Sequence, residues 1–287
     1  MYFTKMQGAG NDFVLVEASD LKRDWSRLAI TMCDRHFGIG SDGLLLLLPS
    51  DIVDFRMRMF NPDGSESNAC GNGLRCLVKY ALLCKGLLVG KAQEMSIETI
   101  SGIRKARFPK MGGQVTNVQV SMGTPKFGAG DIPVLVVLNE EEPVDLKPIL
   151  NYPVTVEGKE LPMSFVSMGN PHTVCFWQYP VSDFPLSRLG PKVEHHRIFP
   201  NRVNFEVARV INRQQIKARV WERGVGETLA CGSGACAIAV VAQLLGYIEK
   251  KVDIILSGGI LEVEWDGIGE VFLSGPAEIV FTGEWLE

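Results

Sequence analysis

Apolar residues recur at helical spacing in two segments of the chain, and each segment directly follows a cysteine. The first segment places five apolar residues on one helical face, at Leu74, Leu77, Val78, Ala81 and Leu82. The second segment repeats this spacing between Ile238 and Leu245 and fills the other faces with apolar residues as well. A helix that is apolar all round lies buried, so we expect the second helix at the centre of its domain.

Strands are predicted on both sides of each helix. Residues 13–16 and 44–48 are apolar runs of strand length, and residues 55–59 alternate between apolar side chains and arginines as a half-exposed strand does. Further strand patterns fall at residues 96–100, 104–108, 115–120, 162–168, 173–177, 204–211, 215–220, 252–256, 260–265, 271–274 and 277–282. Two strand-rich halves predict an α+β fold of two pseudo-symmetric domains, each a largely antiparallel or mixed sheet wrapped around a central buried helix.

The length of the chain agrees with two domains. It has 287 residues, of which 46% are hydrophobic, and a domain commonly holds about 100 to 200 residues. Residues 123–131 are rich in Gly and Pro and lie between strand patterns. This stretch is therefore the best candidate for the linker between the two domains. We therefore expect an N-terminal domain of residues 1–123 plus about 275–287, and a C-terminal domain of residues 124–274.

The two helices share a motif where they begin. Ala69-Cys70-Gly71-Asn72-Gly73 precedes the first and Ala230-Cys231-Gly232-Ser233-Gly234 the second, and a glutamate stands four residues before each cysteine. A lone cysteine beside a glycine is most often a small buried hydrophobe. The same motif in both halves instead favours a chemical role for Cys70 and Cys231, while the other five cysteines are expected to pack.

The position of these cysteines has chemical consequences. The first backbone N–H groups of a helix have no internal partner and carry the positive end of the helix dipole, so they form a site for an anion such as a carboxylate. A thiol at the same place is expected to ionise more readily than usual. We expect each half to supply one acid–base thiol and half of a carboxylate cradle.

Composition narrows the class of protein. The net charge is −4 and the basic residues are scattered, so nothing indicates nucleic acid or a membrane surface as a partner. No signal-peptide pattern opens the chain, and its longest apolar run is far shorter than the about 20 residues of a membrane span. Seven cysteines without C-x-x-C spacing favour reduced thiols over a disulfide framework or a metal site. We expect a cytoplasmic protein that acts on a small molecule and holds no metal.

Other polar residues are open between a structural and a functional role. His172 follows Gly-Asn-Pro in a predicted turn, and Glu222-Arg223-Gly224 closes a strand before the second motif. A hydrogen-bonded turn histidine and an ion pair at a strand end are the structural alternatives, although arginine also suits bidentate binding of a carboxylate. Five asparagines beside Gly or Pro or at strand ends indicate by themselves only turns: Asn11, Asn61, Asn72, Asn170 and Asn204.

Six stretches, in this order, carry a resemblance to a known family. They are Gly8-Ala9-Gly10-Asn11-Asp12-Phe13 and residues 34–40, 60–66, 70–76, 166–172 and 222–232. Together they resemble diaminopimelate epimerase, from about residue 1 to the C-terminus. The resemblance implies two α/β domains related by pseudo-symmetry, with the active site in the cleft between them.

The same resemblance implies an activity and its residues. The activity is cofactor-independent epimerisation of LL-2,6-diaminopimelate to the meso isomer, on the route to lysine and cell-wall precursors and without pyridoxal phosphate. Cys70 and Cys231 are implied as thiolate base and thiol acid, with His172 and Glu222 in support. The implied substrate-binding residues are Asn11, Asn61, Gly71, Asn72, Asn170, Asn204, Glu222, Arg223, Gly232 and Ser233. A homodimer stays open.

A requirement for two thiols also follows from the chemistry. Inverting a stereocentre by proton transfer removes a proton from one face and returns one to the opposite face, which a single fixed group cannot do. Without an electron sink, the carbanion needs fixed N–H donors on its carboxylate in a site that excludes water. Domain closure is the expected way to expel that water.

Three alternatives stay open at this point. An epimerase or racemase for proline or hydroxyproline keeps both thiols but has no second amino-acid end to bind. A thiol hydrolase or acyl transferase needs one nucleophilic cysteine and a histidine base. A metal- or redox-linked binding protein is expected to use Cys70, Cys76, Cys231 and Cys236.

Overall fold

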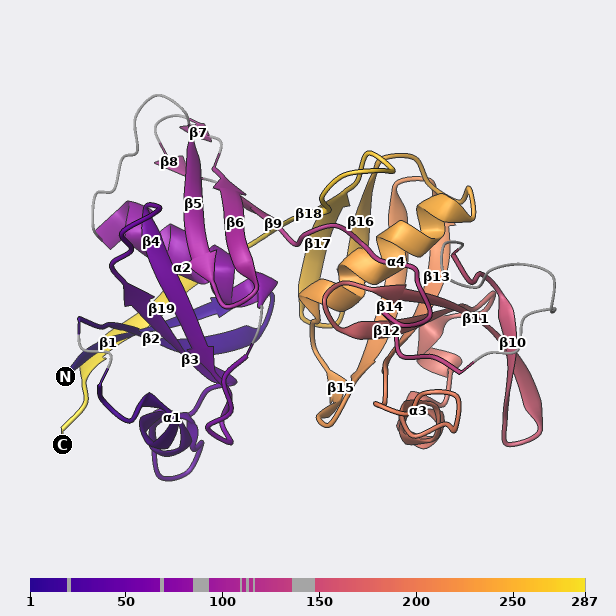
Figure 1. The fold of residues 1–287 in the computed structure, drawn as a ribbon, viewed down its shortest axis with the longest axis horizontal. Helices are drawn as coiled ribbons and strands as arrows, with labels where there is room; N and C mark the ends of the chain where they lie inside the picture. Colours follow the sequence, from indigo (N-terminus) through magenta and orange to yellow (C-terminus); the bar gives the residue numbers. More distant parts are fainter. Residues whose placement is uncertain are drawn as a thin grey trace. The chain divides into compact units, whose positions relative to one another are not determined.

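The computed structural model describes residues 1–19, 22–67, 70–84, 93–108, 110–111, 114–115, 117–135 and 148–286; Ala69 of the first motif lies outside them. The chain divides into two units, Met1–Ser121 with Ser274–Glu287, and Met122–Leu273. In Figure 1 the first unit runs from indigo to magenta with a yellow C-terminal strand, and the second is mainly pink to orange. Each unit has one mixed sheet and two α-helices in its described part.

The first unit is a mixed sheet whose two helices both connect parallel strands. The strand pairs β2–β3 and β4–β5 are parallel, and the pairs β19–β1, β1–β2, β3–β4, β5–β6 and β6–β9 are antiparallel. The bounds are β1 (Tyr2–Gly8), β2 (Asn11–Glu17), α1 (Trp25–Cys33), β3 (Gly43–Leu48), β4 (Phe55–Phe60), α2 (Gly71–Cys84), β5 (Glu94–Thr99), β6 (Gly102–Arg107), β9 (Val118–Ser121) and β19 (Glu278–Glu284). A separate hairpin joins β7 (Lys110–Met111) to β8 (Gln114–Val115).

The second unit repeats this plan. The strand pairs β12–β13 and β14–β16 are parallel, and the pairs β10–β11, β11–β12, β13–β14, β14–β15 and β16–β17 are antiparallel. The bounds are β10 (Tyr152–Val156), β11 (Lys159–Ser167), β12 (Pro171–Phe176), the 3₁₀ turn η1 (Val181–Asp183), α3 (Leu186–Glu194), β13 (Asn204–Asn212), β14 (Gln215–Glu222), β15 (Gly226–Thr228), α4 (Gly232–Leu244), β16 (Lys251–Leu256) and β17 (Gly259–Glu264). β18 (Phe272–Gly275) leads from this unit back to the first.

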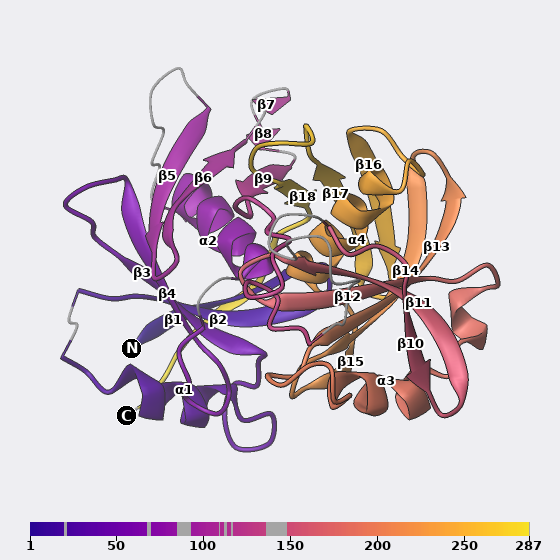
Figure 2. The same cartoon turned by 45° about the vertical axis from the view of Figure 1, so that its right-hand side comes forward.

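The two units therefore share one order of elements. In each, an antiparallel hairpin is followed by a short helix and then by a strand that runs parallel to the second strand of the hairpin. The next connection between parallel strands contains the helix that begins after a cysteine. Figure 2 shows α2 and α4 each lying across the strands of its own unit. This repeat confirms the predicted α+β fold with two similar halves.

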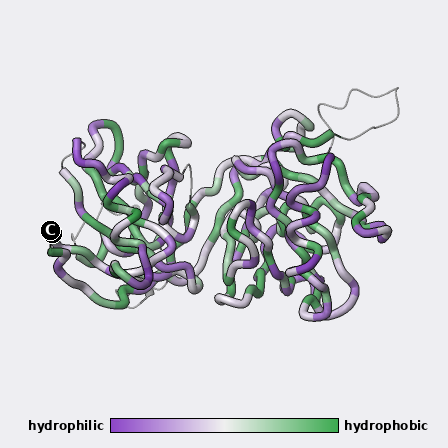
Figure 3. The backbone as a smooth tube through the Cα atoms, turned by 90° about the horizontal axis from the view of Figure 1, so that it is seen from below, coloured by the Kyte–Doolittle hydropathy of each residue, from purple (hydrophilic) through white to green (hydrophobic). Residues whose placement is uncertain are grey.

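The central strand β3 of the first unit is covered on both faces, which explains its apolar run. In the first unit Val14, Leu44 and Leu46 belong to one core cluster with residues of α1, while the side chain of Leu45 lies against the first turn of α2. Every residue of β3 is buried, as expected for a strand covered on both faces. Long apolar stretches are visible in both units in Figure 3.

The two central helices differ as their sequences predict. Ten residues of α4 are buried, and they lie on all its faces from Gly232 to Ala242. It contacts β11, β12, β13, β16 and β17. α2 is buried over its first two turns and then on one face only, at Ala81 and Leu82. The prediction that the second helix is buried is confirmed, with Ser233, Gln243 and Leu244 as its three residues outside the buried class.

Two short helices, α1 and α3, and four strands, β1, β7, β10 and β15, were not predicted from the sequence. α1 has nine residues, and α3 contains Pro191, which normally disfavours a helix interior. β1 was missed because it contains a buried lysine: the ammonium of Lys5 binds the carbonyl of Gly40 and lies 2.6 Å from Asp12. β10 was missed as well.

α3 is held against β14 by a buried glutamate. The carboxylate of Glu194 accepts hydrogen bonds from Nε1 of Trp221 at 2.8 Å and from the backbone N–H of Gly224 at 2.9 Å. A Cβ atom on Gly190 in the same helix would lie 2.5 Å from the indole ring of Trp221. α3 thus fixes the end of the strand that carries Glu222 and leads into Arg223.

We predict that Gly190→Ala lowers the free energy of unfolding by about 1–3 kcal/mol, because overpacking against a ring exceeds the roughly 1 kcal/mol that alanine gains in helix propensity. Gly130→Ala is the matched control, since a Cβ there meets no atom within 4 Å. Chemical denaturation of both variants tests this. Equal stability of Gly190→Ala and the unmodified protein would contradict the packing described here.

Candidate active site

Cys70 caps the helix α2. Its carbonyl accepts the first helical hydrogen bond, from the N–H of Leu74 at 2.8 Å, and its Sγ accepts one from the N–H of Gly73 at 3.3 Å. The residue is partly buried. The sulfur therefore lies at the positive end of the helix, with the N–H groups of Gly71 and Asn72 in the same first turn.

Cys231 takes the same position on α4. Its backbone is extended, with φ −126° and ψ 115°, and its carbonyl accepts a hydrogen bond from the N–H of Ala235 at 2.9 Å. The sulfur lies 3.5 Å from Oγ of Ser233. Unlike Cys70, the residue is buried, at 6% exposure.

A glycine is required at the third helical residue in both units. A Cβ atom on Gly73 would lie 3.5 Å from Sγ of Cys70 and 2.9 Å from the side chain of Leu45. On Gly234 it would lie 3.4 Å from Sγ of Cys231 and 2.9 Å from Oε1 of Glu206. The motif glycine thus leaves space beside each sulfur.

The glutamate four residues before each cysteine pairs with an arginine of the preceding strand in both units. Glu66 forms a bidentate ion pair with Arg58 of β4, with N–O distances of 2.6 and 2.9 Å. Glu227 does so with Arg219 of β14, at 2.8 and 2.9 Å. These pairs attach the segment before each helix to the preceding strand, so the duplication extends beyond the cysteines.

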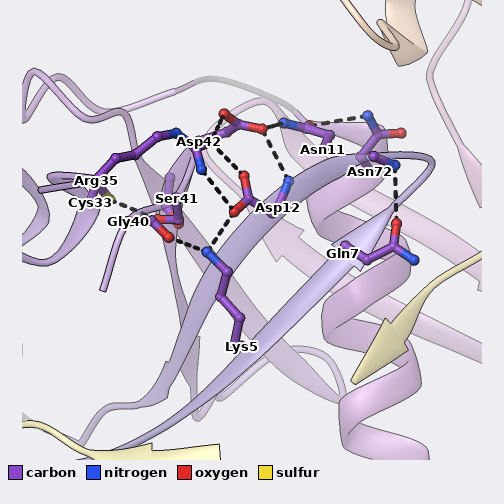
Figure 4. Close-up of polar contacts among 12 residues, drawn as sticks. Lys5, Gln7, Asn11, Asp12, Cys33, Arg35, Gly40, Ser41, Asp42 and Asn72 are labelled. Atoms are coloured by element: carbon purple, nitrogen blue, oxygen red, sulfur yellow. Dashed lines mark hydrogen bonds and ion pairs between the residues drawn. The ribbon is translucent and has the colours of Figure 1, made fainter. Parts of the chain in front are cut away.

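In the first unit, hydrogen bonds fix the amide of Asn11 (Figure 4). Its Nδ2 donates to Asp42 at 2.7 Å, and its Oδ1 accepts from Nδ2 of Asn72 at 3.1 Å. Oδ1 also lies 3.9 Å from Sγ of Cys70. Asn72 is held in turn by Arg75, whose Nη2 donates to its Oδ1 at 2.7 Å.

A charged network holds Asp42 in place. Arg35 lies 2.7 Å from Asp42 and 2.8 Å from Asp12, and Lys5 completes the network on the other side of Asp12 (Figure 4). Burial alone would raise the pKa of Asp12, but the hydrogen bonds from Arg35 and Lys5 outweigh burial and lower it to about 2. Asp12 is therefore ionised at neutral pH, and the ion pairs that it and Asp42 form with Arg35 hold the carboxylate that orients Asn11.

In the second unit, His172 is fully buried between two side chains. Its Nδ1 lies 2.7 Å from Oε1 of Glu206, and its Nε2 lies 3.0 Å from Oδ1 of Asn170. Asn170 in turn donates to Oγ of Ser233 at 3.4 Å. The structure thus brings His172, Asn170 and Ser233 together beside Cys231.

The surroundings of Cys231 disfavour its thiolate. Burial raises the pKa of Cys231 well above its usual value, and the negative charges of Glu222 and Glu206 raise it further. Hydrogen bonding from Ser233 and from the N–H of Gly234 acts in the opposite direction but is weaker. The expectation of easy ionisation at a helix start is therefore wrong for Cys231, because burial and the two carboxylates outweigh the hydrogen bonds that favour its thiolate.

The remaining site residues predicted from the sequence lie on loops and strand ends. Oε1 of Glu222 accepts from Thr228 at 2.6 Å. Asn204 is buried and uses its amide on the backbone, donating to the carbonyl of Pro171 at 2.8 Å and accepting from the N–H of Arg223 at 2.9 Å. The side chain of Arg223 is exposed and donates to the carbonyl of Asn201 at 3.2 Å. Asn61, in the turn after β4 of the first unit, donates to Oγ of Ser65 at 2.9 Å.

Sequence reasoning missed two carboxylates, Asp42 and Glu206. Asp42 directly precedes the buried strand β3, and Glu206 is the one charged residue in the apolar stretch 205–208. A carboxylate beside or inside a buried strand requires a partner, which is the signal that identifies both.

Two further observations concern the described part of the chain. In the ranges given above, no three His, Cys, Asp or Glu side chains form a cluster that could bind a metal ion, and no helix is both long and apolar enough to cross a membrane.

Burial raises the pKa of Cys76 to about 12. Cys76 is therefore a protonated thiol packed in the core, as predicted, whereas the same prediction is wrong for Cys84, which is exposed.

The fold resembles several solved structures. A PhzF-family phenazine biosynthesis protein of Bacillus anthracis superposes with a TM-score of 0.70 at 19% identity, over 100% of this chain and 99% of that one. A hydroxyproline epimerase from Agrobacterium vitis gives a TM-score of 0.67 at 15% identity, over 99% and 91%. At such low identity these likenesses show the fold alone.

Sequence relatives are much closer. A diaminopimelate epimerase of Moorella thermoacetica is 46% identical over 288 residues, covering 99% of both chains. One of Acetivibrio thermocellus is 44% identical over 286 residues, covering 99% of this chain and 98% of its own. The sequence pattern of the family described as diaminopimelate epimerase matches residues 3–128 and 164–280. The chain therefore belongs to the diaminopimelate epimerase family.

Proposed function

We propose that this protein epimerises LL-2,6-diaminopimelate to meso-diaminopimelate without a cofactor, using Cys70 and Cys231 as its two acid–base groups. The names of its relatives support the substrate. The observation that carries the mechanism is the repeated helix start: in each unit a cysteine caps the buried helix and a glycine leaves space beside its sulfur.

The reaction needs one thiolate and one thiol. The thiolate removes the α-proton of the substrate, and the electron pair of the broken C–H bond stays on the α-carbon as a carbanion. The second thiol then gives its proton to the opposite face of that carbon. The first sulfur ends as a thiol and the second as a thiolate, so the reverse reaction uses the same two groups with exchanged roles.

The two helix starts are suited to hold the reacting carboxylate. The backbone N–H groups of Gly71, Asn72, Gly232 and Ser233 belong to the first turns of α2 and α4 and have no partner within their helices. Fixed N–H donors stabilise the negative charge that moves from the carbanion onto the carboxylate. Asn11, His172 and Glu222 complete the polar surroundings of the reacting centre in this proposal.

The electrostatics of the second unit suggest the starting protonation states. Burial and two carboxylates keep Cys231 protonated before substrate binds. In this proposal Cys231 begins as the acid, and Cys70 removes the first proton.

The distal amino-acid end of the substrate binds Asn61, Asn170, Asn204 and Arg223. The exposed guanidinium of Arg223 suits a carboxylate, and Asn204 fixes the backbone of Arg223.

Hydrogen exchange tests the reaction directly. We predict that the purified protein in deuterium oxide, without added cofactor, introduces deuterium at one α-carbon of LL-diaminopimelate as the meso isomer appears in the NMR spectrum. Proline and hydroxyproline, incubated in parallel, are expected to exchange no deuterium. Exchange on either of these with none on diaminopimelate would remove the proposed substrate.

Each catalytic thiol can be tested by a single-atom change. Cys70→Ser and Cys231→Ser are each expected to lower kcat by about 100-fold or more, because a serine hydroxyl is a far weaker acid and general acid–base catalysis contributes that much. Cys84→Ser, at the exposed end of α2, is the control and should keep full activity. Either active-site variant with near-normal turnover would refute the role of its thiol.

The network around Asn11 generates a further prediction. Asp42→Ala removes the charged acceptor that fixes the amide of Asn11 and should lower kcat/KM by about tenfold, which corresponds to one hydrogen bond to a charged group. Asp24→Ala is the matched control, since Asp24 also accepts a backbone hydrogen bond but only caps α1. Steady-state kinetics of the two folded variants measure the effect. Equal kcat/KM for Asp42→Ala and Asp24→Ala would show that Asp42 has no part in the site.

A further inference from the structure

An arginine of the first unit is buried beside the site and has no role in the reaction as described so far. The side chain of Arg75, on α2 one turn after Asn72, is the largest fully buried side chain among the described residues. Its Nη2 donates to Oδ1 of Asn72 at 2.7 Å, and its Nε donates to the carbonyl of Pro276 at 3.5 Å. Burying a guanidinium is costly, so its presence calls for a compensating use.

The backbone of the first unit encloses this guanidinium. A Cβ atom on Gly8, at the end of β1, would lie 3.5 Å from Nη2 of Arg75 and 3.2 Å from the carbonyl oxygen of Pro276. Asn72 is 2% exposed. The hydrogen bond between Arg75 and Asn72 is therefore shielded from water, where a bond from a charged donor is strong.

The chemistry of the guanidinium fixes the direction in which the amide of Asn72 faces. A guanidinium has only donors, so it meets Oδ1 of Asn72 and leaves Nδ2 to face Asn11. That Nδ2 donates to Oδ1 of Asn11 at 3.1 Å, and Nδ2 of Asn11 donates to the carboxylate of Asp42 at 2.7 Å (Figure 4). A donor-only group at one end of the chain and a carboxylate at the other thus permit one orientation of both amides.

This orientation decides which end of the Asn11 amide faces the first thiol. Oδ1 of Asn11 lies 3.9 Å from Sγ of Cys70. If both amides were turned over, the NH₂ group of Asn11 would take that place and offer the sulfur a donor instead of an acceptor. An asparagine at a helix start also tends to bond the backbone N–H groups near it. The bond from Arg75 occupies the oxygen of Asn72 that would do so.

We propose that Arg75 is a positioning residue for the first half of the site. By binding Oδ1 of Asn72, it sets the direction of the hydrogen-bond chain through Asn72 and Asn11 and so presents Oδ1 of Asn11 to Cys70. The proposal rests on the two-thiol function above, in which Cys70 and Asn11 lie at the reacting centre. Arg75 acts through Asn72 and does not itself touch substrate.

A double-mutant cycle tests whether Arg75 acts through Asn72. Arg75→Met and Asn72→Ala should each lower kcat/KM for LL-diaminopimelate about tenfold, the effect of one hydrogen bond to a charged group. The double variant should also lose about tenfold, because the second change removes nothing that the first left intact. A loss of about 100-fold in the double variant would overturn the proposal.

Another substitution tests the direction of the chain and leaves Arg75 in place, so it applies even if Arg75→Met does not fold. Asn72→Asp keeps an oxygen for Arg75 to bind but replaces the NH₂ group that faces Asn11 by a second oxygen. It should keep the native melting temperature and lower kcat/KM about tenfold. Full activity of Asn72→Asp would overturn the proposed direction.

Val78→Ala is the matched control for the packing of α2. Val78 is buried on this helix one turn beyond Arg75. Its truncation should lower the melting temperature and leave kcat/KM unchanged. A loss of kcat/KM equal to that of Arg75→Met would mean that loosening of the helix, and not the direction of the amides, explains the effect of Arg75.

A measurement without substrate separates this proposal from the proposed reaction. In protein labelled with nitrogen-15 arginine, the hydrogen that Nη2 of Arg75 donates should give a separate NMR signal, assigned by its loss in Arg75→Lys. This signal should remain in Asn72→Asp and disappear in Asn72→Ala, and its persistence in Asn72→Ala would overturn the contact.

The combined results distinguish the two claims. If the signal behaves as expected while diaminopimelate shows no deuterium exchange, the contact of Arg75 stands and the proposed reaction falls. If exchange occurs and the double variant loses about 100-fold, the reaction stands and the positioning role of Arg75 falls.

Discussion

The start of one buried helix in each unit is the constraint on which the rest of the site depends. α2 and α4 are packed against their sheets, and each begins directly after a cysteine whose carbonyl accepts the first helical hydrogen bond. The first N–H groups of a helix have no internal partner. The sulfur and these N–H donors therefore lie at the same end of the helix. The ion pairs Arg58–Glu66 and Arg219–Glu227 then fix the segment before each cysteine to the preceding strand. A thiol next to the first N–H groups of a buried helix is therefore built twice from one plan.

The two copies differ in the groups that surround the sulfur. Cys70 is partly exposed and lies beside Asn11, whose amide is held by Asp42, and Arg35 joins Asp42 to Asp12. Cys231 is buried and faces Glu206, Glu222 and His172. A proton-transfer pair that works from two faces of one carbon needs one group ionised and the other protonated at the start. In the proposed reaction, the buried and acidic surroundings of Cys231 make it the protonated member of the pair, so the proposal gives a role to the difference between the two halves.

The sequence predicted the features that depend on local pattern. The repeated Cys-Gly motif and the apolar spacing after it predicted two helices, and the apolar character of residues 235–242 on every face predicted that the second is buried, as the structure confirms. Alternation and apolar runs predicted most strands, from β2 to β19. α3 could not be predicted because Pro191 lies inside it, and β1 because its buried Lys5 depends on a carboxylate and a carbonyl from other segments. The prediction that Cys231 ionises easily was wrong for the same reason. The pKa of Cys231 depends on burial and on Glu206 and Glu222, which only the tertiary fold brings close to the sulfur. The functional roles of the site residues stay predictions.

The central claim is that two thiols serve opposite faces of a single carbon atom. A crystal structure of the protein with meso-diaminopimelate bound tests it most directly. The account predicts one α-carbon with Sγ of Cys70 on one side and Sγ of Cys231 on the other, each at about 3–3.5 Å, the separation of groups poised to react. A bound substrate with both sulfurs on the same side of that carbon, or with one of them out of reach, would contradict it.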